Sequence, residues 1–422
     1  MSKRFIFGSI ILCFNLLLVF FIGELYARTK HGDMLDIRAR EASYRKVDFQ
    51  LHHSFIPDST GRSITKEWDV TYDINSFGLR DRDYPVVKPE STCRILVLGD
   101  SFTEGYGVEI EDAFVKILER RLNGISGEKP VYEVINCGIA GYSPLLEYLF
   151  LVKKGLQLNP DMVVLFYDFG DLKDDYEYER VTVFGKDGMP LGCSPLKRVR
   201  AFSSNPVEHF LLKYSRFYLY IENRMNKLLY KLKKIGFKQY INDNVSCKEH
   251  ILFDKSENSD IDRFVVFREN NGYILRRLWQ KNEKYIRLIH EMLRDNGVAF
   301  VLATYPYAIE INGVEWSEGR REYGFKVGEE YAEPIVVDFM RRYAEEEGIP
   351  FIDVYTYFKE SDLKPLYFDF DGHFTDNGHR VMAESMFKEL KKVLSEVLPD
   401  NQFAEGRVPR AERTSNLSEV EN

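Results

Sequence analysis

Five short apolar segments, separated by stretches with a helical pattern, constrain the fold of this chain more than any other feature. Runs rich in Val, Ile, Leu and aromatic residues are typical of parallel strands buried on both faces. They occupy residues 95–98, 132–135, 162–167, 298–304 and 350–354. Helical patterns lie between and after them, at residues 113–122, 145–155, 278–294, 334–347 and 377–398. This alternation predicts an α/β fold with a doubly wound parallel sheet.

A serine directly follows the first predicted strand, and an imidazole and a carboxylate lie together far along the chain. The first segment reads Gly99-Asp100-Ser101, and the second reads Asp371-Gly372-His373. Ligands bind at the carboxyl ends of strands in open α/β sheets, so Ser101 is a candidate nucleophile. A helix N-cap is the structural alternative for Ser101, and a polar turn is the alternative for Asp371. Together the three side chains supply the nucleophile, the base and the orienting group that acyl transfer through a serine ester requires.

Three blocks in this order resemble the SGNH (GDSL-type) hydrolase superfamily. They are residues 99–105, residues 136–143, and residues 371–374 followed by 377–379, and the resemblance spans about residues 70–175 and 285–395. It implies a flavodoxin-like three-layer α/β/α fold with a five-stranded parallel sheet. It also implies esterase, lipase, deacetylase or acyltransferase chemistry, with no metal and no organic cofactor. In this resemblance His379 is a structural residue at the start of the last helix.

The resemblance also assigns the groups that would stabilise the oxyanion. It suggests the backbone N–H groups of Ser101 and Gly138, the latter at a position where glycine permits close backbone approach. The superfamily's usual third donor is an asparagine after the third strand, where this chain has Gly170. A glycine offers only its backbone N–H. Asp100, Gly170 and Asp171 are further candidates for contact with the substrate.

The position of the orienting carboxylate departs from the commonest pattern of the superfamily. Many members carry an aspartate three residues before the histidine, where this chain has Phe370. Asp371 lies two residues before His373 and is the expected orienter, an arrangement that resembles the membrane-linked acyltransferase and deacetylase branches. Asp369, four residues before His373, is the reserve candidate. A further acidic group, predicted as a solvated rim, a cation site or a contact for sugar hydroxyls, consists of Asp168, Asp171, Asp174 and Asp175.

The N-terminus has the composition of a membrane anchor. Residues 5–23 are uncharged and mostly apolar, which suits a spanning helix, and no small-residue cleavage site follows. Positive charges after the helix argue against export by the positive-inside rule; they are Arg28, Lys30, Arg38 and Arg40. The resemblance to envelope members of the superfamily favours a catalytic domain outside the cytoplasm, in the periplasm. The formal net charge of −8 argues against nucleic acid as the main partner.

These observations divide the chain and define a function. The expected units are an anchor at 1–29, an arm packing on the core at 30–90, a hydrolase domain at 91–175 and 266–398, a helical insertion at 176–265, and a disordered tail at 399–422. The insertion contains a basic amphipathic helical pattern at 207–235, interpreted as a cap or a membrane-facing helix, and Cys193 and Cys247 as a candidate disulfide. The sequence predicts a serine-dependent ester hydrolase or O-acyltransferase acting on an acylated envelope glycan or lipid. The alternative is a non-catalytic glycan-binding or assembly protein on a degenerate hydrolase fold.

Overall fold

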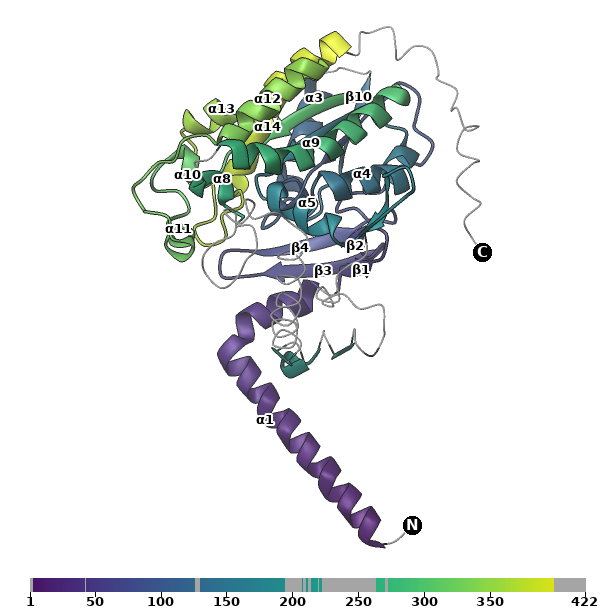
Figure 1. Cartoon of the computed structure of the whole chain (residues 1–422), viewed down its shortest axis with the longest axis vertical. Helices are drawn as coiled ribbons and strands as arrows, with labels where there is room; N and C mark the ends of the chain where they lie inside the picture. Colours follow the sequence, from purple (N-terminus) through teal and green to yellow (C-terminus); the bar gives the residue numbers. More distant parts are fainter. Residues whose placement is uncertain are drawn as a thin grey trace.

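A five-stranded parallel sheet forms the centre of the computed structural model (Figure 1). The structure describes residues 3–41, 43–125, 130–193, 207, 210–211, 214–218, 220–221, 263–269 and 272–397. The strands of the sheet, in spatial order, are β11 (Phe351–Ile352), β10 (Ala299–Thr304), β7 (Met162–Tyr167), β5 (Thr92–Leu98) and β6 (Val131–Asn136). The chain passes from β5 to β6 on one side and then returns to β7 on the other, which is the flavodoxin-like order. The predicted α/β fold with a five-stranded parallel sheet is therefore confirmed.

Helices cover both faces of this sheet (Figure 1). On one face α3 (Phe114–Ile125) packs against α14 (Asp376–Val397). On the other, α9 (Gly272–Asp295) packs against α4 (Pro144–Lys153), α5 (Asp171–Glu179) and α12 (Ile335–Glu347). The shorter helical elements are α2 (Ser101–Glu104), η1 (Ile110–Asp112), η2 (Gly155–Leu158), α8 (Val265–Arg268), α10 (Ala308–Ile311), α11 (Ser317–Tyr323) and α13 (Tyr355–Lys359).

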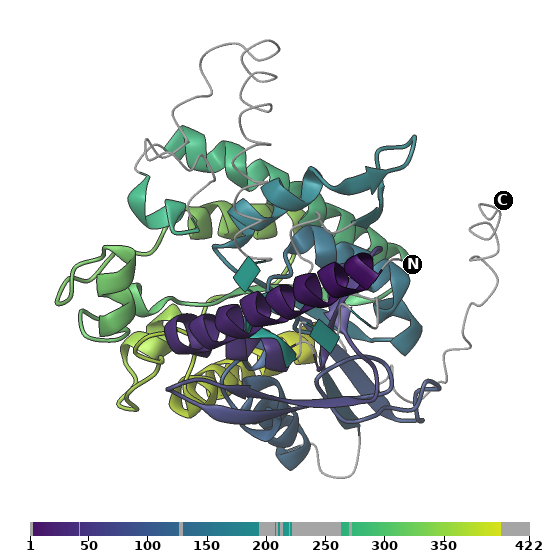
Figure 2. The same cartoon turned by 90° about the horizontal axis from the view of Figure 1, so that it is seen from below.

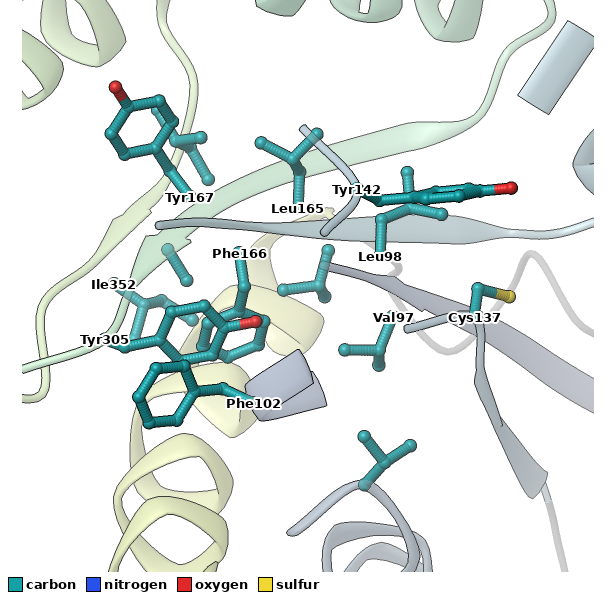
Figure 3. Close-up of a cluster of buried hydrophobic side chains, with 14 of the residues drawn as sticks. Val97, Leu98, Phe102, Cys137, Tyr142, Leu165, Phe166, Tyr167, Tyr305 and Ile352 are labelled. Carbon is teal, nitrogen blue, oxygen red and sulfur yellow. The ribbon is translucent and has the colours of Figure 1, made fainter. Parts of the chain in front are cut away.

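The core runs through the sheet to the carboxyl ends of β5 and β7. Val97, Leu98 and Leu165 are completely buried, and Leu98 pairs with Leu165 in the parallel register (Figure 3). Beyond the strand ends the packing becomes aromatic. The Tyr305 ring stacks on Phe166 at 4.9 Å and on Phe102 at 5.0 Å between centroids. This aromatic stack supports the first turn of α2, where the predicted nucleophile lies.

The N-terminal part of the chain forms a long helix and two hairpins. Helix α1 (Lys3–Glu41) projects away from the sheet (Figure 1), and the view from below shows it in front of the hairpins (Figure 2). Its segment Phe7–Thr29, with mean hydropathy 2.3, is the one helix within the described residues that is long and apolar enough to cross a membrane, a test that a signal sequence also passes. The hairpin strands are β1 (Arg45–Asp48), β2 (His52–Phe55), β3 (Ser59–Ile64) and β4 (Asp69–Ile74).

The predicted insertion, at 176–265, starts within α5 and continues with an antiparallel hairpin, β8 (Thr182–Phe184) and β9 (Pro190–Cys193). Most of the predicted helix at 207–235, the residue Cys247 and the tail at 399–422 lie outside the described residues. A short described part contacts α1. There the Glu24 carboxylate accepts hydrogen bonds from the backbone N–H groups of Arg216 (3.0 Å) and Phe217 (2.9 Å). The structure therefore ties this part of the insertion to the apolar N-terminal helix.

Candidate active site

Ser101 lies at the sharp turn between β5 and α2. The chain leaves the buried strand through Gly99, whose φ of 156° is a conformation that side chains disfavour. A Cβ at Gly99 would also collide with the Tyr305 hydroxyl and with Thr103. Asp100 is the N-cap of α2, and its carboxylate accepts a hydrogen bond from the Phe102 N–H at 3.0 Å. The N-cap role that was the alternative for Ser101 is thus filled by Asp100, and the Ser101 hydroxyl lies 3.2 Å from the other oxygen of the Asp100 carboxylate.

The structure brings Ser101, His373 and Asp371 into one hydrogen-bonded chain. The Nε2 atom of His373 lies 2.6 Å from Ser101 Oγ, and its Nδ1 atom contacts Asp371 Oδ1. The imidazole packs between the Phe102 ring at 4.8 Å and the Tyr106 ring at 5.1 Å. This is the order of contacts that a nucleophile, a general base and an orienting carboxylate require.

The electrostatics of the pair suit a general base. Burial lowers the pKa of His373, but the Asp371 charge and hydrogen bond outweigh burial, so the pKa of His373 is raised above 6.5. Burial raises the pKa of Asp371, but the contacts with His373 outweigh it and lower that pKa below 3.8. Asp371 therefore stabilises the protonated imidazole that forms when His373 takes a proton.

Asp369 does not contact the histidine. Its carboxylate accepts hydrogen bonds from the Ser317 N–H at 2.6 Å, the Ser317 hydroxyl at 2.8 Å and the Glu318 N–H at 3.3 Å. These groups belong to the first turn of α11, so Asp369 anchors the start of that helix. Of the two candidate orienting carboxylates, only Asp371 contacts the imidazole of His373.

The predicted oxyanion donors differ in their availability. Ser101 is the first residue of α2, and within the described residues its N–H has no acceptor. The Gly138 N–H donates to Asn136 Oδ1 at 3.0 Å, and the Gly170 N–H donates to Asp168 Oδ1 at 2.6 Å. Gly138 nevertheless lies tightly against the backbone of α2, where a Cβ would collide. The Ser101 amide is therefore the donor that is free in this arrangement.

The expectation of a solvated acidic rim is wrong. Asp168, Asp171 and Asp175 are 3%, 2% and 0% exposed. Asp168 accepts hydrogen bonds from the Tyr307 hydroxyl at 2.8 Å, Asp171 accepts from the Asp168 N–H at 3.0 Å, and Asp175 accepts from Asn282 Nδ2 at 2.6 Å. Asp171 and Gly170, predicted to contact substrate, are thus buried parts of the turn after β7. Among the described residues no group of His, Cys, Asp and Glu is arranged to hold a metal ion.

An aromatic pocket opens beside the Ser101–His373–Asp371 chain. Its lining combines side chains from just before α8, from the loop before α11 and from α11 itself with the triad loop: Phe102, Arg263, Phe264, Tyr307, Ala308, Trp316, Tyr323, Asp371, Gly372 and His373. The Trp316 ring stacks with Tyr323 at 5.5 Å between centroids. Motif reasoning missed Arg263, Phe264 and Trp316, because nothing in the sequence near them marks their proximity to Ser101.

Residues of the N-terminal arm contact α2 and the residues after it, and so support the turn that carries Ser101. Glu104, fully buried in α2, forms an ion pair with Arg45 of β1 and accepts a hydrogen bond from the Ala140 N–H at 2.6 Å. Arg80, also fully buried, donates to the Gly105 carbonyl at 2.6 Å and to the Val108 carbonyl at 2.7 Å. His379 is buried, and its Nδ1 accepts a hydrogen bond from a backbone N–H of α3, in agreement with a structural role.

Comparison with known proteins gives a family match and several structural likenesses. Residues 267–421 match the family model described as "SGNH hydrolase-like domain, acetyltransferase AlgX". Comparison with curated proteins gives no match. Solved structures similar to this one include the acetyl xylan esterase AlAXEase, with 16% identity over 70% of this chain and 98% of that chain and a TM-score of 0.36. Another is a catalytic mutant of the acetylxylan esterase Axe2 from Geobacillus stearothermophilus, with 15% identity over 76% and 100% and a TM-score of 0.36. A GDSL-like lipase from Bacteroides thetaiotaomicron has 13% identity over 72% and 89% and a TM-score of 0.33.

The family match covers the segment that carries Asp371 and His373. The structure places this segment against the serine turn at the end of β5, and Gly138 packs against the same turn. Over residues 267–421 the chain is therefore similar to the SGNH hydrolase-like domain that this family model describes.

Proposed function

We propose that this protein is a serine-dependent enzyme that transfers an acyl group from an ester, through an acyl-enzyme, to water or to a hydroxyl acceptor. The hydrogen-bonded chain of Ser101, His373 and Asp371 beside an open aromatic pocket is the observation that carries this proposal. Hydrolysis and transfer share the acyl-enzyme and differ only in the acceptor.

In the first half-reaction Ser101 Oγ attacks the ester carbonyl while His373 Nε2 takes the hydroxyl proton. The tetrahedral intermediate collapses, the C–O bond to the leaving alcohol breaks, and His373 returns the proton to that oxygen. In the second half-reaction His373 removes a proton from water or from the acceptor hydroxyl while its oxygen attacks the acyl-enzyme. The bond between the acyl carbon and Ser101 Oγ then breaks, and His373 returns the proton to Ser101 Oγ. Asp371 keeps the imidazole in the tautomer whose Nε2 can accept a proton. The Ser101 N–H supplies an oxyanion contact, and the Gly138 N–H can add a second once it leaves Asn136.

An acetylated glycan or lipid of the cell envelope is the substrate class that we propose. The matching family model is described as an acetyltransferase, and two of the similar structures are esterases of acetylated xylan. The Trp316 and Tyr323 rings in the pocket could stack on the apolar face of a sugar. The apolar segment Phe7–Thr29 would hold the domain at a membrane, outside the cytoplasm.

The engagement of the Gly138 and Gly170 amides favours a second candidate, a glycan-binding protein that has kept the fold without turnover. One experiment separates the two. Full-length protein is treated with an organophosphonate probe and digested, and p-nitrophenyl acetate turnover is measured beside the Ser101→Ala variant. The enzyme predicts an adduct on Ser101 and turnover that the variant loses, since a missing triad member can cost about six orders of magnitude. The absence of both adduct and turnover in the wild type would support the binding protein.

A further inference from the structure

The hairpin β3–β4 forms hydrogen bonds with the loop that carries Asp371. Glu67, in the turn of this hairpin, accepts a hydrogen bond from the Phe370 N–H at Oε1 and another from the Asp371 N–H at Oε2, both at 2.9 Å. One carboxylate thus binds two consecutive amides with its two oxygens. Because Asp371 is 304 residues away in the chain, this contact is purely tertiary.

The hairpin turn presents Glu67 in a fixed geometry. The Thr65 N–H donates to the Trp68 carbonyl at 2.9 Å, and Thr65 Oγ1 accepts hydrogen bonds from the N–H groups of Glu67 (3.0 Å) and Trp68 (3.2 Å). Trp68 in turn donates from Nε1 to Ser63 Oγ at 2.9 Å. Each of these bonds closes the turn on itself, so the Glu67 side chain projects from a constrained backbone.

A line of aromatic rings continues from the same turn to the catalytic histidine. The Trp68 ring lies 5.0 Å from Phe368 and 5.4 Å from Tyr106, and Tyr106 lies 5.1 Å from the His373 ring. The Phe368 N–H donates to the His373 carbonyl at 2.9 Å, which closes the loop that contains Asp371. The hairpin therefore contacts this loop in two ways: Glu67 binds backbone amides of the loop, and the Trp68 ring packs against Phe368.

We propose that Glu67 is a positioning residue for the Asp371–His373 pair, so that the N-terminal arm is a working part of the active site. This rests on the function proposed above. Asp371 must remain in hydrogen-bond contact with His373 Nδ1, and displacements of about 1 Å at such groups can cost about 100-fold in rate. The bonds from Phe370 and Asp371 to Glu67 are exposed to solvent, so water can replace Glu67 as an acceptor but cannot fix the position of the loop.

The test compares Glu67→Gln with Glu109→Gln in the full-length protein in detergent micelles. Glu109 Oε1 accepts a hydrogen bond from the Thr71 N–H of the same hairpin at 2.9 Å but does not bond the Asp371 loop, so it is the matched control. Glutamine at 67 places an NH2 group where one of the two amides needs an acceptor. We expect kcat for p-nitrophenyl acetate to fall about 10- to 100-fold in Glu67→Gln with KM within about twofold, and to stay within about twofold in Glu109→Gln.

Two further readouts separate positioning from general support of the fold. If Glu67 acts through Asp371, Glu67→Gln should cost less than about threefold in an Asp371→Asn background, because the contact it protects is already lost. The downfield proton resonance of His373 Nδ1–H should weaken or shift in Glu67→Gln and not in Glu109→Gln. This resonance tests the contact even if the wild type neither turns over ester nor reacts with organophosphonate, in which case only the proposed function fails.

The proposal is overturned if Glu67→Gln keeps both wild-type kcat and the His373 resonance. It is equally overturned if the loss of kcat is the same in the Asp371→Asn background as in the wild type, or if Glu109→Gln loses as much activity and thermal stability as Glu67→Gln. Glu67→Asp is the second variant should Glu67→Gln fail to fold. It keeps the charge but is one methylene shorter, and we expect a smaller loss of kcat with the same dependence on Asp371.

Discussion

Two carboxylates in one loop, Asp371 and Asp369, should respond in opposite ways to the same substitution. Asp371→Asn replaces the acceptor on His373 Nδ1 with a side chain that can donate through its NH2 group. The imidazole then favours the tautomer whose proton lies on Nε2, facing Ser101, where it cannot accept the serine proton. In the template triad this change costs about 10⁴ in kcat, which is about 5 kcal/mol of transition-state stabilisation.

Asp369→Asn should instead affect stability. Its carboxylate accepts three hydrogen bonds from Ser317 and Glu318 at the start of α11 and none from His373. Loss of an N-terminal helix cap typically costs about 0.5–2 kcal/mol, which for a domain of this size lowers the Tm by a few degrees. Because α11 borders the aromatic pocket, KM can rise modestly, but kcat should stay within a few-fold of the wild type.

The assay is kcat for p-nitrophenyl acetate and the thermal unfolding midpoint, both measured on the two variants and the wild type in the same detergent. The expected result is a kcat lowered by about 10⁴ with a near-wild-type Tm for Asp371→Asn, and the reverse pattern for Asp369→Asn. If Asp369→Asn were the variant that loses kcat by orders of magnitude, the assignment of Asp371 as the orienter of His373 would be refuted. Equal and modest losses in both variants would refute the tautomer argument.

Because the Asp371 charge raises the pKa of His373 above 6.5, kcat/KM of the wild type should rise with pH through that raised pKa. In a pH–rate profile of Asp371→Asn, the same rise in kcat/KM should occur at lower pH. Burial raises the pKa of Asp174 to about 7, so the native state binds more protons than the unfolded state, and Asp174→Asn should gain stability over the wild type between about pH 4 and 7, measured by urea unfolding. Arg45→Met should lower the unfolding free energy by about 3–5 kcal/mol because it leaves the buried Glu104 charge unpaired, and adding Glu104→Gln should recover part of this loss. Full-length protein should stay with membranes in a high-salt wash, whereas a chain lacking residues 1–29 should not, since burial of an apolar helix is insensitive to salt.

The sheet could be predicted from the sequence because each central strand is a continuous apolar run. The prediction for β7 matches its bounds, and β5 and β10 agree at their carboxyl ends, where the site is built. One edge strand, β11, is shorter than predicted, at Phe351–Ile352, because only these two residues pair with β10. The hairpins of the arm were not predicted, since strands such as β3 (Ser59–Ile64) are polar and short and become ordered through packing against distant residues.

At the site, the sequence identified the residues that lie in contiguous motifs and missed those that tertiary contacts bring in. Ser101, His373 and Asp371 carry their own local pattern, and the structure places them in contact. Arg45 and Glu67 carry none. The burial of Asp175 could not be predicted either, because a helical stretch rich in charged residues, such as 171–179, has the pattern of a solvated face. Its desolvation depends on partners such as Asn282, 107 residues away.

The contacts of the arm also show that the sheet alone does not hold the active site in place. The serine turn depends on the ion pair between Arg45 and Glu104 and on the carbonyl contacts of Arg80, and both arginines precede the first strand of the sheet. An uncompensated Glu104 carboxylate in that interior would cost several kcal/mol, a large fraction of the net stability of a domain. The smallest unit that can hold Ser101 in place therefore begins before Arg45, at the end of the N-terminal helix. In this protein the segment that leads from the apolar helix to the sheet therefore also supports the turn that carries the nucleophile.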